Sequence, residues 1–144
     1  MQRIVRVMLA SVCVCCGAMG VSCEKPEVAI AGQRDRTVRF TDIRVGNGNE
    51  AVEGTQIACH YRGYLPDGTE FMNTRKTGRG RAHVWNVGDG SVIMGIDIAV
   101  RGMRPGGVRE TTLPPEMHWG NGGYGGVIPK DSRIRFVIEM VRVR

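Results

Sequence analysis

Glycine is the feature that most limits how this chain can fold. The sequence contains 21 glycines, and more than half of them lie between Gly78 and Gly126. A glycine inside a helix costs about 1 kcal/mol relative to alanine, whereas in tight turns glycine supplies the positive φ angles. This third of the chain therefore cannot form a bundle of long helices. With 144 residues, 42% of them hydrophobic, we expect one strand-rich globular domain and an N-terminal extension.

Alternation of apolar and polar side chains predicts several strands. Residues 55–64 place Ile57, Cys59 and Tyr61 on one face, and residues 134–140 repeat this pattern near the C-terminus. Other predicted strands, between turns rich in Gly, Pro and Asn, begin at Val38 or cover residues 69–74, 83–87 and 108–113.

One compact helix is predicted at residues 96–101, because Ile96, Ala99 and Val100 share a helical face. Residues 75–81 and 114–129 contain many glycines and are predicted to be loops. Strands around a single helix indicate an α+β fold, in which an antiparallel twisted β-sheet half-wraps around one short α-helix.

The first 22 residues have the layout of a secretory signal. Arg3 and Arg6 give a basic start without an acidic residue, and an apolar run of about 15 residues follows. A membrane-spanning helix needs about 20 apolar residues. The segment 1–22 is therefore predicted to be a signal peptide, with a short membrane span as the alternative.

Cys23 is a candidate lipidation site. It follows Gly20, Val21 and Ser22, an order that resembles a bacterial lipobox, although an aliphatic residue is usual at the position of Gly20. Cleavage and release without a lipid is the alternative. Residues 23–36 are polar and aperiodic, so we expect a flexible tether to a domain at 37–144. This predicts an exported protein of the periplasm or cell envelope, held at the membrane by its lipid.

The formal net charge of +6 is mildly basic. It could favour an anionic membrane surface, but an Arg-rich soluble surface explains it more simply. Arg75, Lys76, Arg79 and Arg81 form a basic run with no interleaved aromatic residue. Such a run favours a solvated loop, so no nucleic-acid partner is expected.

Neither cysteine nor histidine spacing predicts a metal or a cofactor. Four of the five cysteines lie within the first 23 residues, so Cys59 is left without a partner for a disulfide. His60, His83 and His118 have no carboxylate at metal-ligand spacing.

Five motifs follow one another between residues 60 and 139. They read HYRGYLPDGTEF from His60, VIMGIDIAVRGM from Val92, LPPE from Leu113 with WG at Trp119, GGVIP from Gly125, and IRFVIE from Ile134. In order and at nearly the same spacing, they resemble the motifs of the FKBP-type peptidyl-prolyl isomerases. The resemblance covers roughly residues 38–144 and implies the FKBP fold.

The resemblance also implies a site. The residues in catalytic positions would be Tyr61, Phe71, Ile93, Trp119 and Phe136, with Ile93 offering its backbone N–H to a substrate carbonyl. The residues in substrate-binding positions would be Met72, His83, Val92, Ile96, Val127 and Ile128. An isolated aromatic residue in a strand is more often part of the core, but the ordered motifs favour a site for this set.

FKBP-type isomerases rotate X–Pro peptide bonds of proline-containing polypeptides. The barrier is about 18–20 kcal/mol, because rotation breaks amide resonance. An apolar pocket that seats the proline ring and excludes water favours the twisted amide over the planar one. This chemistry needs no nucleophile and no cofactor.

Three residues depart from the family pattern. Met72 stands where an Asp is usual, so a hydrogen-bond acceptor is lost, and Asn73 would face the other way on a strand. Ile96 stands where well-known members have Trp. Trp119 replaces a Tyr, and its indole N–H can donate but not accept. We expect reduced isomerase activity and weakened affinity for macrolide inhibitors.

Three functions stay open at this stage. The first is an exported isomerase that assists the folding of envelope or secreted proteins. The second is an FKBP-fold module that holds proline-containing segments with weak or no turnover, which Met72 favours. The third is a surface lipoprotein that contacts a partner macromolecule. The short tether indicates a monomer.

Overall fold

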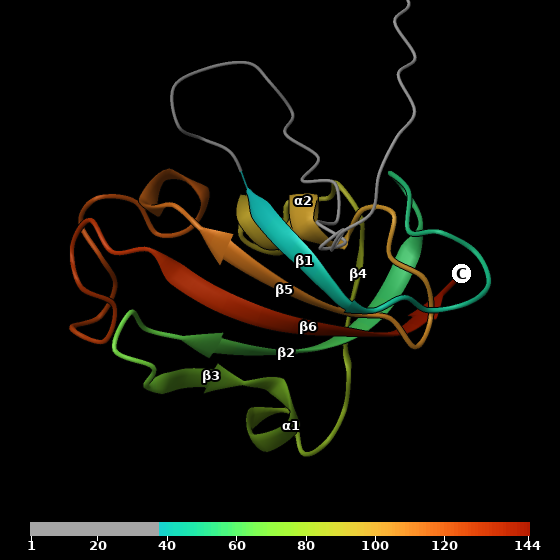
Figure 1. Cartoon of the computed structure of the whole chain (residues 1–144), viewed down its shortest axis with the longest axis horizontal. Coiled ribbons are helices and arrows are strands. Elements are labelled where there is room, and N and C mark those ends of the chain that lie inside the picture. Colours follow the sequence, from blue (N-terminus) through green and yellow to red (C-terminus); the bar gives the residue numbers. More distant parts are fainter. Residues whose placement is uncertain (1–37) are drawn as a thin grey trace, which may run out of the picture.

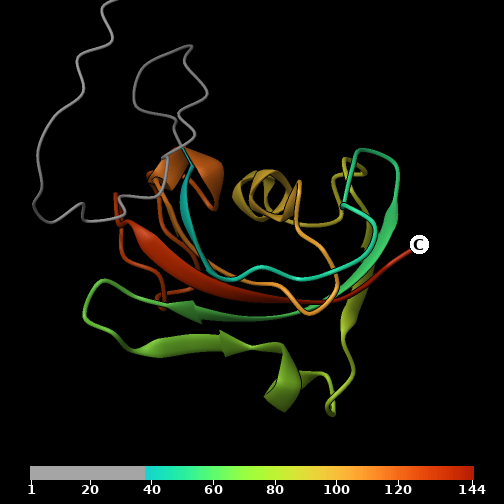
Figure 2. The same ribbon diagram turned by 45° about the vertical axis from the view of Figure 1, so that its right-hand side comes forward.

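The computed structural model describes residues 38–144, which fold around one six-stranded antiparallel sheet. The strand order is β1-β5-β6-β2-β3, and β4 also pairs with β2. In chain order the elements are β1 (Arg39–Arg44), β2 (Gln56–Tyr64), β3 (Glu70–Asn73), α1 (Thr74–Thr77), β4 (His83–Asn86), α2 (Met94–Val100), β5 (Val108–Leu113), the 3-10 turn η1 (Pro115–Met117) and β6 (Ile134–Val143). The sheet curves, and α2 lies against its concave face (Figures 1 and 2). The predicted α+β fold is confirmed.

Strands β2 and β6 form the centre of the sheet and supply much of the core. Every second side chain of β6 from Ile134 to Met140 is fully buried. On β2, Ile57, Cys59 and Tyr61 belong to the same apolar cluster, as their alternation predicts. Burying one large aliphatic or aromatic side chain contributes about 1.5–3 kcal/mol. The period-two pattern therefore fixes which face of the sheet receives the helix.

Helix α2 covers the apolar face. Ile96, Ala99 and Val100 are buried as predicted, although the helix begins earlier than expected, at Met94, and ends at Val100. Gly95 lets the helix lie close to β5, because a Cβ atom there would be 2.6 Å from Leu113 Cδ1.

Arg109 of β5 fixes the C-terminal end of α2. Its Nη1 donates to the carbonyl oxygens of Ala99 and Arg101 at 2.8 and 2.9 Å. Its Nε donates to the Asp42 carboxylate of β1 at 2.6 Å. A buried guanidinium thus satisfies carbonyl groups that a helix end leaves without partners.

One edge of β2 is shared by two short strands. Arg62 and Gly63 pair with β3, whereas Gln56 to Cys59 pair with β4. Between them the chain leaves the sheet. The loop predicted at residues 75–81 begins as one helical turn, α1, because Asn73 Oδ1 accepts from the backbone N–H of Arg75 at 3.0 Å. A single turn is too short to produce a helical period in the sequence.

The glycine-rich segment 114–129 is also more ordered than a plain loop. It contains η1, and the backbone N–H of Tyr124 donates to the carbonyl of Ile128 at 3.1 Å. Ile128 is buried in the core and anchors this segment to the sheet.

The predicted signal peptide 1–22, the tether 23–36 and the lipidation site Cys23 lie outside the described residues. In the range 38–144, no helix is long and apolar enough to cross a membrane.

Candidate functional site

A hollow of about 170 Å³ is lined by residues of α2 and of the sheet. The lining residues come from the strands β2, β3, β4 and β6, from α2 with the segment before it, and from the segment after η1: Tyr61, Met72, His83, Ser91, Val92, Ile93, Ile96, Trp119 and Phe136. Eight of these nine residues are among the predicted site residues. The sheet thus brings together side chains that are far apart in the sequence.

The floor of the hollow is rigid and apolar. Ile96 is 2% exposed, Phe136 0% and Tyr61 8%. The rings of Tyr61 and Phe136 pack edge to face with centroids 6.2 Å apart, a favourable aromatic geometry. Phe71 does not line the hollow itself, but its ring packs edge to face on Phe136 at 5.8 Å. The predicted Phe71 therefore supports the floor from behind.

A hydrogen bond crosses one wall of the hollow. The Tyr61 hydroxyl and Nδ1 of His83 are 2.8 Å apart, and the two rings are tilted with centroids separated by 5.9 Å. Burial, followed by the nearby Cys59, raises the pKa of Tyr61, so its hydroxyl keeps its proton at neutral pH. An imidazole from β4 thus provides a hydrogen-bonding partner for Tyr61 in a hollow where Met72 offers none.

The backbone N–H of Ile93 is free at the entrance to α2. The Ile93 carbonyl accepts from the N–H groups of Ile96 and Asp97 at 3.0 and 3.2 Å. Its own N–H makes no hydrogen bond with any residue of the range 38–144. Since Ile93 lines the hollow, this donor is available to a carbonyl group placed there.

The rim carries two stacked aromatic rings. Trp119 packs edge to face on Phe71 at 6.2 Å and stacks on Tyr124 at 5.3 Å with an interplanar angle of 28°. Tyr124 is 60% exposed. Tyr124 was not among the predicted site residues, because it lies between glycines in a segment predicted as a loop. An exposed aromatic residue next to a motif Trp was the available signal.

Besides Phe71, two predicted residues lie away from the lining. Val127 is exposed and Ile128 is buried in the core. Their backbone turn holds Tyr124 beside Trp119, since the N–H groups of both residues donate to the Tyr124 carbonyl at 3.0 Å. Ser91, which sequence reasoning also missed, lines the mouth of the hollow, and only its tertiary position shows this.

Other reactive groups lie apart from the hollow. Burial raises the pKa of the Cys59 thiol to about 12, and its sulfur contacts Met140 Sδ at 3.4 Å. This thiol is therefore inert at neutral pH. Among residues 38–144, no three His, Cys, Asp or Glu side chains are placed to hold a metal ion.

Comparison with known proteins gives consistent matches. The family model for FKBP-type peptidyl-prolyl cis-trans isomerase matches residues 48–141. An "FK506-binding protein" of Neisseria meningitidis serogroup B is 40% identical over 102 residues, which cover 71% of this chain and 92% of that protein. "FK506-binding protein 1" of Dictyostelium discoideum is 36% identical over 104 residues, covering 72% and 95%.

A solved structure shows the same arrangement of elements. The crystal structure of AtFKBP13 superimposes with a TM-score of 0.68 and 33% sequence identity, covering 74% of this chain and 93% of the other.

Proposed function

Because the chain belongs to the FKBP-type peptidyl-prolyl cis-trans isomerase family, we propose that it rotates X–Pro bonds in the hollow beneath α2. Members of this family are peptidyl-prolyl cis-trans isomerases. The observation that carries the proposal is that Tyr61, Ile96 and Phe136 meet in one hollow with a free backbone donor at its entrance. The proline ring would rest on these three side chains.

The rate gain comes from selective binding of the twisted amide. Rotation about the C–N bond removes resonance, so the carbonyl loses polarity and gives up hydration more easily. A floor of Ile96 and Phe136 offers no hydrogen bonds and displaces water, which favours the twisted form over the planar one. Each 1.36 kcal/mol of such preference raises the rate about tenfold.

Two polar groups would orient the substrate. The Ile93 N–H donates to a substrate carbonyl and holds the chain across the mouth of the hollow. The Tyr61 hydroxyl, held by His83 at 2.8 Å, presents a second polar atom on the opposite wall. The stacked rings of Trp119 and Tyr124 would cover apolar residues next to the proline.

The Ile93 donor provides a sharp test. Ile93 has φ −59° and ψ 142°, angles that proline adopts, so Ile93→Pro removes the N–H with little change of backbone. We expect Ile93→Pro to lower kcat/KM for a prolyl tetrapeptide about tenfold, since a hydrogen bond of this kind contributes about 1–1.5 kcal/mol. Ile93→Ala keeps the backbone N–H and is the control. Its kcat/KM should fall less than that of Ile93→Pro. Wild-type rates no higher than buffer, with several residues before proline, would contradict the isomerase proposal.

A binding module without turnover is the second candidate. It is favoured by Met72, which lines the hollow where the family pattern has a carboxylate. Adding a proline peptide should shift the amide resonances of Tyr61, Ile93 and Trp119 in either case. Only an isomerase also speeds exchange between the cis and trans signals of that peptide, so two-dimensional exchange spectra separate the two functions.

Macrolide binding is expected to be weak. Related proteins carry the name "FK506-binding protein". We propose that this hollow accepts the same class of ligand with lower affinity, because Met72 and Trp119 change its polar edge. Inhibition of the isomerase by FK506, compared with the Met72→Asp variant, measures this: the variant should bind more tightly.

The cellular role proposed from the sequence is assistance to the folding of envelope proteins by a monomeric, lipid-anchored enzyme. The support is the basic and apolar start of the chain and the lipobox-like residues before Cys23. Cys23→Ala should abolish metabolic labelling with an alkyne fatty acid and move the protein into the soluble fraction. Unchanged labelling of the variant would exclude Cys23 as the acceptor.

A further inference from the structure

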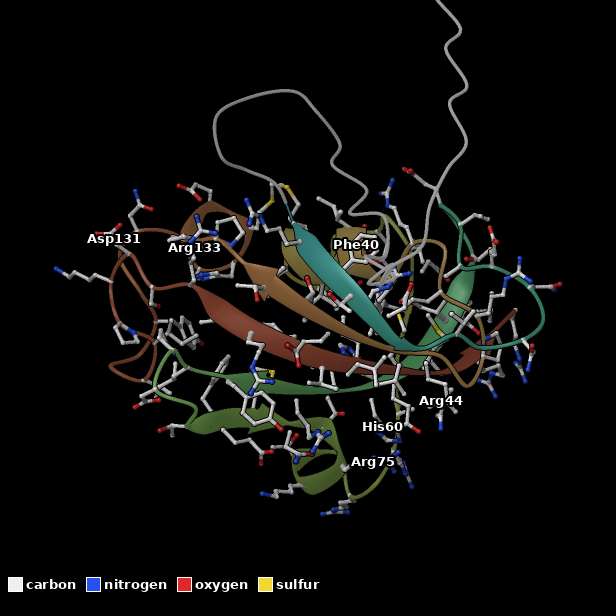
Figure 3. All side chains as sticks on the ribbon, viewed as in Figure 1. Phe40, Arg44, His60, Arg75, Asp131 and Arg133 are labelled. Atoms are coloured by element: carbon white, nitrogen blue, oxygen red, sulfur yellow. The ribbon has the colours of Figure 1, made fainter. Side chains whose placement is uncertain are left out.

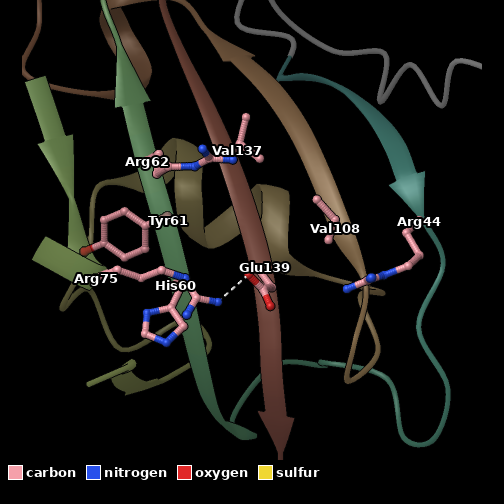
Figure 4. A pocket seen from close by; sticks show the side chains of 8 residues that line it. All are labelled: Arg44, His60, Tyr61, Arg62, Arg75, Val108, Val137 and Glu139. Atoms are coloured by element: carbon pink, nitrogen blue, oxygen red, sulfur yellow. Dashed lines mark hydrogen bonds and ion pairs between the residues drawn. The ribbon is translucent and has the colours of Figure 1, made fainter. Parts of the chain in front are cut away.

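A second hollow, of about 280 Å³, lies outside the proposed isomerase site. Figure 4 shows its lining, which comes from four strands and from α1: Arg44, His60, Tyr61, Arg62, Arg75, Val108, Val137 and Glu139. Figure 3 shows that Arg44, His60 and Arg75 also lie close together in the whole molecule. Three of the lining side chains are guanidinium groups, and one is a carboxylate.

The sheet register builds this hollow. Arg44 of β1 pairs with Val108 of β5, Val108 pairs with Glu139 of β6, and Glu139 pairs with His60 of β2. Paired residues point to the same face of a sheet, so one row crosses four strands. Two residues along, Val137 pairs with Arg62 and adds a second row on that face.

Helix α1 closes the row by placing Arg75 over Glu139. Nη2 of Arg75 lies 2.7 Å from Oε2 of Glu139, as the dashed line in Figure 4 marks. The hydrogen bond from Arg75 is the main cause that lowers the pKa of Glu139, and the positive charges of Arg75 and Arg44 act in the same direction. Glu139 is therefore ionised at neutral pH, and its carboxylate holds the guanidinium group of Arg75 at the hollow.

The positive charge of the hollow exceeds this one carboxylate. Nε of Arg44 donates to the Gly106 carbonyl at 2.7 Å, which anchors the guanidinium while its other N–H groups stay available. The backbone of Arg62 is part of the sheet, but its guanidinium group makes no hydrogen bond or ion pair with another residue in the range 38–144. The nearby Glu70 carboxylate is already paired with Lys76 at 2.7 Å. The hydrogen bond from Lys76 is the main cause that lowers the pKa of Glu70, and the charge of Arg62 contributes less.

His60 adds a neutral hydrogen-bonding group. Burial, followed by the charge of Arg75, lowers the pKa of His60 below 6.5. Its imidazole is therefore uncharged at neutral pH. Three guanidinium groups and one carboxylate leave an excess of two positive charges, which a dianion would balance.

We propose that this hollow binds a phosphate group. Arginine presents a planar fork of donors that matches phosphate oxygens, and its weak hydration makes it suited to such contacts. The volume of about 280 Å³ admits a phosphate with bound waters, since one water occupies about 30 Å³. Arg44 and Arg62 supply the donors from two sides, and Arg75 shares its guanidinium between Glu139 and the ligand.

Titration with sodium phosphate at constant ionic strength tests this proposal. Backbone amide shifts in the protein should saturate and should centre on His60, Arg62, Arg75 and Glu139. Arg62→Gln and Arg44→Gln should each weaken phosphate binding at least threefold, roughly the effect of losing one exposed charged partner. Arg142→Gln, an exposed arginine of β6 outside the hollow, is the control and should bind as the wild type does.

Glu139→Gln gives a readout that misfolding cannot imitate. Removing the carboxylate frees Arg75 and eliminates like-charge repulsion, so phosphate should bind about threefold more tightly or better. Shifts that do not saturate, equal binding by Arg62→Gln, or weaker binding by Glu139→Gln would overturn the proposal. Equal affinity for acetate would also overturn it, because a carboxylate carries one charge less.

A second experiment distinguishes phosphate in solution from phosphate in a lipid headgroup. Vesicles of phosphatidylglycerol, compared with phosphatidylcholine, should bind the protein in an Arg62-dependent way if the source is a lipid surface. Saturable binding of inorganic phosphate without such vesicle binding assigns a soluble ligand. Isomerase activity, measured in parallel, should be unaffected by Arg142→Gln and reports separately on the site beneath α2.

Discussion

The hydroxyl oxygen of Tyr61 lies 2.8 Å from Nδ1 of His83, and both side chains line the hollow beneath α2. This pair joins the centre of β2 to the first residue of β4. The pair places a polar contact on a wall of the hollow. The sequence had predicted that this pocket lacks a hydrogen-bond acceptor, because Met72 stands where the family pattern has an Asp. The hydrogen bond holds the Tyr61 ring against Phe136, so it links the orientation of the hydroxyl to the shape of the floor.

We predict that His83→Phe lowers isomerase kcat/KM by about threefold to tenfold, because one buried hydrogen bond contributes about 1 kcal/mol. The Tyr61 hydroxyl would then lack its partner and its orientation. His83→Gln, whose amide can still bond the hydroxyl, should retain most of the activity. Equal losses in both variants, measured with the same prolyl peptide, would contradict a role for the hydrogen bond, and a larger loss in His83→Gln would show that the ring of His83 matters more than its hydrogen bond.

Gly63→Ala should distort the floor of the hollow. A Cβ atom at Gly63 would lie 2.7 Å from Cζ of Phe71 and 2.8 Å from Cε1 of Phe136, so both rings must move. We expect a loss of about 1–3 kcal/mol in the free energy of unfolding, typical of overpacking, and reduced activity at temperatures where the variant stays folded. Gly122→Ala, with no atom within 4 Å of the new methyl, is the matched control. Urea unfolding that does not separate the two variants would contradict this account.

Arg109→Met should destabilise the domain by about 2–4 kcal/mol, because it removes the buried donor shared by two helix-end carbonyl groups and weakens the binding of the partly exposed Asp42 carboxylate. The Arg109 side chain is 6% exposed and bonds Asp42 as well as the carbonyls of Ala99 and Arg101. Thermal unfolding of Arg109→Met beside Arg104→Met, whose partner Glu50 is exposed, measures the difference. Similar midpoints would show that the buried network contributes little.

Stability should decrease as the pH falls below about 6.5. Burial lowers the pKa of both His60 and His118 from 6.5 in the folded state. The unfolded state then binds protons first, so the free energy of unfolding is highest above 6.5 and declines as the pH falls through the folded-state pKa values. Urea unfolding at several pH values between 5 and 8 measures how the free energy of unfolding depends on pH.

His118→Gln separates one of the two histidines. Nε2 of His118 lies 3.0 Å from the Ser132 carbonyl oxygen, and Nδ1 is buried without a hydrogen-bond partner among the described residues 38–144. A glutamine amide can donate to the same carbonyl but does not titrate. In this variant the free energy of unfolding should therefore change less steeply with pH between pH 5 and 6.5. The same pH dependence as in the wild type would show that His118 does not cause the effect.

The strands were predictable because their signals are local. Alternation over β2 and β6 marks the buried face, and the predicted strand at residues 108–113 coincides with β5. The helix at α2 was predicted from three apolar residues, but its start at Met94 was not, since the first turn carries no apolar period. The single turns α1 and η1 were missed, because each depends on one cap or one hydrogen bond rather than on a repeating pattern.

The members of the site were predictable only in part. The family resemblance named eight of the nine residues that line the hollow. Seven of these lie within or beside a motif, whereas His83 lies between two motifs and was named from the family pattern at that position. Tyr124 and Ser91 border motifs, but the family pattern implied no site role for either of them. Whether the lining residues turn over a substrate stays a prediction that the Ile93 variants address.

The sequence by itself determined the strand-rich class, the buried face of each central strand and the family, since turn residues, alternation and motifs are properties of neighbouring residues. Only the tertiary structure decided that His83 bonds Tyr61 and that Arg44, Arg62 and Arg75 line one hollow with Glu139. Such contacts depend on cross-strand register, which follows from how the whole sheet packs on α2. A residue in β1 and one in β6 become neighbours only when every strand between them is in place.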